Sequence, residues 1–176
     1  LFRSSYHNSF KYVGNIIVKI SDLEAWCKID FSDYPGGQLY LNGESLENLV
    51  IPDNITEIKS RAFTNFSNIS TVTIPENVSS IGYWTFVGCS NLTSVTVKRE
   101  IPAEIDQSSF SNQDNITLYV PAGCKTAYGA ADYWKEFKEI IEEDSSPTIV
   151  FADDKVKALC VANWDINGDG QLSEDS

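Results

Sequence analysis

Residues 46–68 decide the fold and read LENLVIPDNITEIKSRAFTNFSN. Residues 69–91 repeat their apolar pattern as ISTVTIPENVSSIGYWTFVGCSN, and residues 92–115 repeat it again as LTSVTVKREIPAEIDQSSFSNQDN. The repeat distance is 23 residues, drifting to 24 after Ile101. A fixed period of this length predicts a solenoid, in which similar units stack and bury one another's apolar edges. Six apolar positions recur in the three units: Leu46, Leu49, Ile51, Ile55, Ile58 and Phe63; Ile69, Val72, Ile74, Val78, Ile81 and Phe86; Leu92, Val95, Val97, Ile101, Ile105 and Phe110.

Each unit begins with a short strand, because residues 49–51, 72–74 and 95–97 alternate with period two. Pro52 and Pro75 end the first two strands, since proline cannot donate a ladder hydrogen bond. The second half of each unit favours a turn or strand–turn over a long helix. We therefore expect a β-rich α/β fold with stacked parallel strands about 4.8 Å apart.

Both ends of such a stack need a cap. On the N-terminal side, Ser21 and Glu24 form a predicted capping box for a short helix through Leu23, Trp26 and Cys27. Residues 39–41 then alternate as a strand, and residues 42–43 (Asn-Gly) supply a turn. On the C-terminal side, helical spacing from Thr126 predicts a helix with an apolar face of Tyr128, Ala131, Trp134, Phe137 and Ile141.

The repeat pattern, read at residues 46–66 and 69–92, resembles the BspA-like leucine-rich repeat proteins, which are surface proteins of anaerobic bacteria and of some mucosal protozoa. Residues 118–137 resemble the closing unit of that family, and residues 20–29 resemble its N-terminal flank. The resemblance implies non-catalytic binding or adhesion at the cell surface or outside a bacterium. The third unit departs from the pattern at residues 98–102, so we expect an irregular outer turn there.

The chain divides into an N-terminal flank and cap (1–45), the repeats with their C-terminal cap (46–143), and a linker followed by a second segment (144–176). The sequence starts at Leu1 and contains no Met, from which we expect it to be part of a longer chain.

Residues 165–176 resemble the twelve-residue calcium loop of EF-hands and dockerins. Asp165, Asn167, Asp169 and Gln171 occupy loop positions 1, 3, 5 and 7, where Ca²⁺ takes oxygen ligands. Ser176 stands at position 12, which normally supplies a carboxylate. Two interpretations stay open: a calcium site, or a polar terminal loop without metal. Ca²⁺ is the one cofactor that the sequence suggests.

Composition excludes several functions. The formal net charge of −12 over 176 residues opposes binding to nucleic acid or anionic lipid, and no apolar run is long enough to insert into a membrane. Catalysis lacks support, because His7 is the only histidine and neither GxSxG nor a phosphate-binding glycine loop occurs. We therefore predict that the protein is not an enzyme.

The chain has four cysteines: Cys27, Cys89, Cys124 and Cys160. They allow three pairings, none of which the sequence selects, and we favour buried free thiols.

Two groups of residues are candidates for binding a protein or glycan ligand. The first is a row of strand-forming side chains on the predicted sheet face: Thr71, Thr73, Thr96 and Tyr119. The alternative is that this row only reflects β propensity. The second is Tyr83 with Trp84, where Trp84 is either an exposed aromatic anchor or folded over the neighbouring unit.

The predicted function is a recognition or adhesion module. The alternatives are a structural spacer that displays other domains, or a non-catalytic module of a secreted enzyme. Six Asn-x-Ser/Thr sequons follow the repeat, whose geometry explains most of them without glycosylation.

Overall fold

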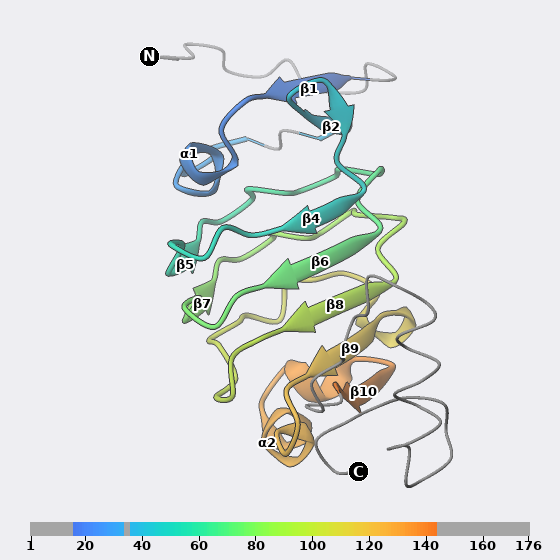
Figure 1. Ribbon diagram of the computed structural model, residues 1–176. Helices are drawn as coiled ribbons and strands as arrows, with labels where there is room; N and C mark the ends of the chain where they lie inside the picture. Colours follow the sequence, from blue (N-terminus) through green and yellow to red (C-terminus); the bar gives the residue numbers. More distant parts are fainter. Residues whose placement is uncertain (1–15, 34–35, 144–176) are drawn as a thin grey trace, which may run out of the picture. The chain divides into compact units, whose positions relative to one another are not determined.

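The computed structural model describes residues 16–33 and 36–143 of the chain (Figure 1). The chain divides into two units, Leu1–Glu143 and Asp144–Ser176, and all described residues belong to the first. The elements of this unit follow in the order β1 (Ile17–Ile20), α1 (Leu23–Cys27), β2 (Gln38–Leu41), β3 (Glu44–Ser45), β4 (Asn48–Val50), β5 (Glu57–Ile58), β6 (Thr71–Ile74), β7 (Ser80–Ile81), β8 (Ser94–Val97), η1 (Gln113–Asn115), β9 (Thr117–Val120), α2 (Lys125–Ala130), η2 (Trp134–Glu136) and β10 (Glu139–Glu142).

The main sheet has five parallel strands in the order β10-β9-β8-β6-β4. Figure 1 shows β4, β6, β8 and β9 side by side with their arrows in one direction. Equivalent residues of successive units are in register, so that Leu49 pairs with Val72 and Val72 with Val95. The strand-rich α/β class and the parallel pairing predicted from the repeat are confirmed.

Two smaller sheets accompany the main one. β5 and β7 pair in parallel, and Figure 1 shows them beyond the arrowheads of β4 and β6. β1, β2 and β3 form a three-stranded sheet in which β2 and β3 are antiparallel. The turn between β2 and β3 has φ of 53° at Asn42 and 92° at Gly43, which confirms the predicted Asn-Gly turn.

The core contains one aromatic ring from each unit at the same repeat position. Phe63 and Phe86 stack with centroids 5.6 Å apart, and Phe86 and Phe110 stack at 5.0 Å. All three rings are buried. Trp134 and Phe137 continue this column at the C-terminal end, at 6.0 Å and 5.3 Å from Phe110. The phenylalanine position chosen from the sequence therefore buries its ring in all three units.

One position in the third unit was assigned wrongly. Ile101 is 69% exposed, whereas Ala103 is buried. The additional residue of this unit enters between Val97, which pairs with Ile74, and Glu104, which pairs with Ser80. The chain accommodates this residue by turning Ile101 outward, so the expected irregular turn at residues 98–102 is confirmed.

The C-terminal cap is not one long helix. α2 ends at Ala130, a single 3₁₀ turn (η2) follows, and Ile141 lies in β10, which pairs with β9. The edge of β9 offers main-chain groups that need partners, and β10 satisfies them where a helix could not. Trp134 and Phe137 are nevertheless buried and stack at 5.6 Å, as expected for the apolar side of this segment.

The N-terminal helix forms as predicted, but its cap differs. Asp22 is the N-cap residue, and its side chain accepts a hydrogen bond of 2.9 Å from the amide of Ala25. Ser21 therefore does not cap the helix. Aspartate is as good an N-cap as serine, so the prediction missed an equally suitable residue directly before Leu23. Figure 1 shows α1 at the end of the repeats that begins with β4 and β5, and α2 beside β10 at the opposite end.

Candidate binding surface

The candidate surface is the outward side of the five-stranded sheet. Side chains alternate along each strand, so Leu49, Val72, Val95 and Leu118 point into the core and are buried. Their neighbours along the strands point the other way. We call these ten residues the outer face: Asn48, Val50, Thr71, Thr73, Ser94, Thr96, Thr117, Tyr119, Glu139 and Ile141.

The strand register arranges the outer face in two rows. One row runs from Asn48 through Thr71, Ser94 and Thr117 to Glu139. The other row runs from Val50 through Thr73, Thr96 and Tyr119 to Ile141. The four sheet residues predicted from the sequence thus lie together on one surface. Glu139 and Ile141 were missed, because the sequence placed this segment in a helix.

The hydroxyl groups of the outer face are not equivalent. Thr71 donates a hydrogen bond of 2.9 Å to Oδ1 of Asn48, its neighbour in the row. Within residues 16–33 and 36–143, the hydroxyls of Thr73 and Thr96 form no hydrogen bond. The centre of the second row therefore presents two hydroxyls that are available to a ligand.

Hydroxyls beside the strands serve the fold instead. Ser70 donates to the carbonyl of Glu47 at 3.0 Å, and Thr93 donates to the carbonyl of Ser70 at 3.3 Å. Each bond joins equivalent positions of adjacent units, 23 residues apart. These contacts hold successive units in register.

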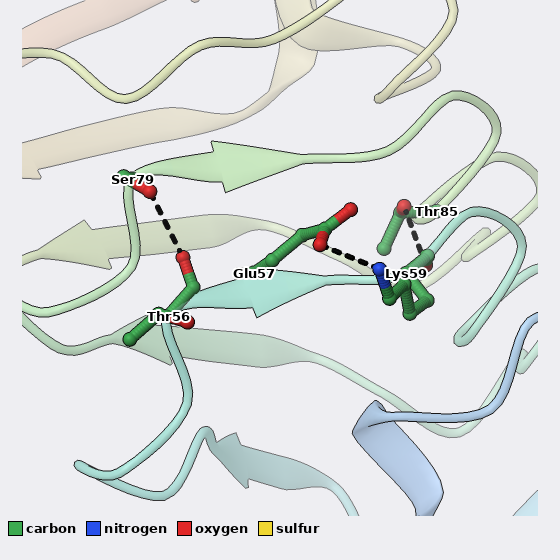
Figure 2. A network of polar contacts seen from close by, with 5 residues as sticks. All are labelled: Thr56, Glu57, Lys59, Ser79 and Thr85. Atoms are coloured by element: carbon green, nitrogen blue, oxygen red, sulfur yellow. Dashed lines mark hydrogen bonds and ion pairs between the residues drawn. The ribbon is translucent and has the colours of Figure 1, made fainter.

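Polar groups near β5 and β7 are also used within the fold, as Figure 2 shows. Ser79 donates to the carbonyl of Thr56 at 3.1 Å, and Thr85 donates to the carbonyl of Lys59 at 3.3 Å. Lys59 in turn forms an ion pair with Glu57 at 2.5 Å. This second side of the repeats is therefore joined by its own polar contacts.

Tyr83 and Trp84 do not belong to the outer face, because they follow β7 rather than a strand of the main sheet. Tyr83 is 49% exposed, and Trp84 is partly buried. The guanidinium carbon of Arg61 lies 4.5 Å from the Trp84 ring centroid and 5.1 Å from that of Tyr83. Arg61 belongs to the preceding unit, so the aromatic pair packs across a unit boundary.

The cluster of Arg61, Tyr83 and Trp84 has an unusual backbone. Arg61 and Trp84 occupy the same repeat position and have φ of 62° and 60°, a region that large side chains rarely adopt. Arg61 also donates to the carbonyl of Phe31 at 3.3 Å. Arg61 was missed as a partner, although its distance of one repeat from Trp84 could have indicated it.

Two of the cysteines that the structure describes are poorly suited to act as nucleophiles. Burial raises the pKa of the Cys27 and Cys89 thiols to about 12, so both stay protonated and are poor nucleophiles. Cys27, Cys89 and Cys124 are buried free thiols, as predicted for these three. In the part of the chain that the structure describes, no group of histidine, cysteine and acidic side chains is arranged to hold a metal. Further candidates lie outside the described residues: His7, Cys160, Asp165, Asn167, Asp169 and Gln171.

Parallel strands paired in register at a 23-residue repeat, with core rings stacked at one repeat position, are typical of repeat proteins. A family model described as BspA type leucine rich repeat region (6 copies) matches residues 36–131, and the chain belongs to this family. Repeat regions of this family are in general non-catalytic protein-interaction modules. The comparison with curated proteins gave no match. Among the described residues, no helix has the length and apolar character needed to cross a bilayer.

Proposed function

We propose that this protein is a recognition and adhesion module that binds a protein or glycan through the outer face of its sheet. The observation that carries the proposal is the second row, Val50–Thr73–Thr96–Tyr119–Ile141. It combines an exposed apolar side chain at Val50 (58% exposed), two available hydroxyls and an aromatic ring on a regular β surface.

The outer face belongs to a paired sheet whose other side packs on the core. Each strand of the sheet has a partner on at least one side, and the stacked rings of Phe63, Phe86 and Phe110 lie in the core. Binding to a preformed surface requires little ordering of loops, which lowers the entropic cost of association.

The family supports a location at the cell surface or outside a bacterial cell, where a recognition module meets its partners. In sequence order, an N-terminal flank and cap (1–45) is followed by a solenoid of repeats with its C-terminal cap (46–143), and then by a linker and the start of a second segment (144–176). Asp165, Asn167, Asp169 and Gln171 then form a candidate calcium loop in the last segment.

The test compares a charge placed on the outer face with the same charge placed elsewhere. Thr96→Glu introduces a carboxylate at the centre of the second row, whereas Thr56→Glu introduces one next to β5, outside the main sheet. Both threonines are surface residues, so neither variant should lose its fold.

Immobilised extracellular-matrix proteins and mucin glycans serve as probes. We expect the unmodified chain and Thr56→Glu to be retained on at least one probe, and Thr96→Glu to lose that retention. Equal retention of all three chains, or no retention of any, would contradict the proposal.

A further inference from the structure

The outer face is nearly uncharged on a strongly acidic protein. The chain has a formal net charge of −12, yet Glu139, at the edge strand β10, is the only charged residue among the ten of this face. An anionic partner would be repelled by the surrounding charge. A cationic partner would be attracted by the net charge, but Glu139 at the end of the first row is the one carboxylate of this face that it could pair with. No residue of the second row is charged, so the complementary ligand is uncharged where it touches this row.

The central part of the face offers hydrogen bonds in both directions. The hydroxyls of Thr73 and Thr96 are adjacent in the row, and each can donate one bond and accept two. Tyr119 follows Thr96 in the same row and adds an aromatic ring with a phenolic hydroxyl. A ligand that lies along this row thus meets polar groups about 4.8 Å apart, followed by an apolar ring.

An extended peptide fits this arrangement poorly. β6, β8 and β9 each have a strand on both sides, so their main-chain groups are already paired and cannot bind a peptide laid across the face. Such a peptide points the N–H and C=O groups of successive residues to opposite sides, so those on one side recur every ~6.6 Å and do not match hydroxyls ~4.8 Å apart. Several of its polar groups would be buried without a partner.

A neutral sugar chain meets the same surface without this mismatch. Its hydroxyls rotate, donate and accept like those of threonine, and those at the margin remain in water. The flat apolar side of a sugar ring can pack on the ring of Tyr119. We propose that the ligand of the outer face is a neutral glycan, bound by Thr73, Thr96 and Tyr119. This inference rests on the proposed function and specifies its partner.

The experiment uses the full chain on an array of three kinds of probe: neutral oligosaccharides, their sialylated and sulfated counterparts, and purified matrix proteins. We expect retention on neutral oligosaccharides, with an affinity that hardly changes between low and high salt, because no ion pair contributes.

Isosteric variants identify the contacts. Thr73→Val with Thr96→Val removes both hydroxyls while keeping shape and β propensity, and we expect it to lower the affinity about tenfold. Tyr119→Ala should lower the affinity by a similar factor, whereas Thr56→Val, the same change outside the face, should leave it unaltered. Circular dichroism and thermal melting of each variant confirm that the fold is intact.

The outcomes separate the two proposals. If matrix proteins are retained, Thr96→Glu abolishes their retention and neutral oligosaccharides are not bound, the glycan inference is overturned while the recognition function stands. A preference for sulfated or sialylated probes would also overturn it. If no probe is retained, or if Thr96→Glu binds as well as the unmodified chain, both proposals fail.

Discussion

The rings of Phe63 and Phe86, which come from adjacent repeat units, lie 5.6 Å apart between centroids with an angle of only 6° between their planes. Phe110 extends the stack with a centroid separation of 5.0 Å and an angle of 17°. These separations are close to the ~4.8 Å between paired strands. The column of rings and the sheet therefore have similar repeat distances, and Phe86 stacks on a ring of the unit on either side.

Replacement of the central ring tests how far the units depend on one another. Phe86→Ala should lower the free energy of unfolding by about 3–5 kcal/mol, because it leaves a cavity between two other rings. Phe86→Leu should cost less, since it fills part of that volume. Urea unfolding followed by tryptophan fluorescence measures both. A loss below about 1 kcal/mol for Phe86→Ala would show that the units are stable separately.

The position of the additional residue in the third unit gives a second prediction. Ile55→Ala should cost about 2–5 kcal/mol, because Ile55 is buried. Ile101→Ala should change the free energy of unfolding by no more than about 0.5 kcal/mol, because Ile101 is exposed. The two substitutions remove the same atoms, so each is the control for the other. An equal loss in the free energy of unfolding for the two variants would show that Ile101 is buried in the core.

A third prediction concerns the one repeat position at which the residue of each unit has a left-handed backbone conformation. Asn65, Gly88 and Asn112 have φ of 60°, 74° and 57°, and a Cβ atom added to Gly88 would lie 2.0 Å from Oδ1 of Asn65. Gly88→Ala should therefore destabilise the protein by about 1–3 kcal/mol, through backbone strain and this clash.

Two further variants separate these causes. Asn65→Gly combined with Gly88→Ala should recover part of the loss, since the clash is removed and the strain is not. Gly129→Ala, in α2 with open space around the added carbon, should stabilise by about 0.5–1 kcal/mol. Thermal melting ranks the variants, and a neutral Gly88→Ala would refute the assigned backbone geometry.

The buried thiols predict a dependence on alkaline pH. The pKa of Cys27 and of Cys89 is raised from 9.0 to about 12 in the folded protein, mainly by desolvation. Above pH 9 the unfolded chain releases these protons while the folded chain keeps them. Their contribution to stability is therefore complete below pH 9 and is lost as the pH rises toward 12.

Unfolding curves at successive pH values measure this effect. Cys27→Ala with Cys89→Ala should lose stability less steeply above pH 9 than the unmodified chain does. Both thiols should also resist iodoacetamide until the protein unfolds, as peptide mass spectrometry can show. Rapid alkylation of either residue in the folded chain would contradict its burial.

The sequence alone predicted most of the repeat architecture, because burial imposes the same apolar residues on every unit. Phe63, Phe86 and Phe110 could be recognised in this way, and so could the face bearing Thr73 and Thr96. A strict period fixes which side chains share a row before any coordinate is known.

The ends of the stack were harder to predict, since the periodic signal stops there. Trp134 and Ile141 fit a helical spacing, yet main-chain pairing with β9 decides the structure at Ile141. The outward turn at Ile101 depends on where one additional residue can be accommodated, which composition does not reveal. The contact of Arg61 with Trp84 crosses a unit boundary; their distance of one repeat makes the two residues neighbours in the stack, but it does not show that the side chains meet.

The hydrogen bonds from Ser70 to Glu47 and from Thr93 to Ser70 link like positions of neighbouring units. Duplication of one whole unit would add its hydrogen-bond donors and acceptors together. These would match the acceptors and donors of the units on either side. Length in a lineage of such proteins can therefore grow or shrink in steps of 23 residues without new chemistry. Insertions shorter than one unit have no such match and can be accommodated only in a turn. The sequences of related proteins should therefore differ most in the outer turns.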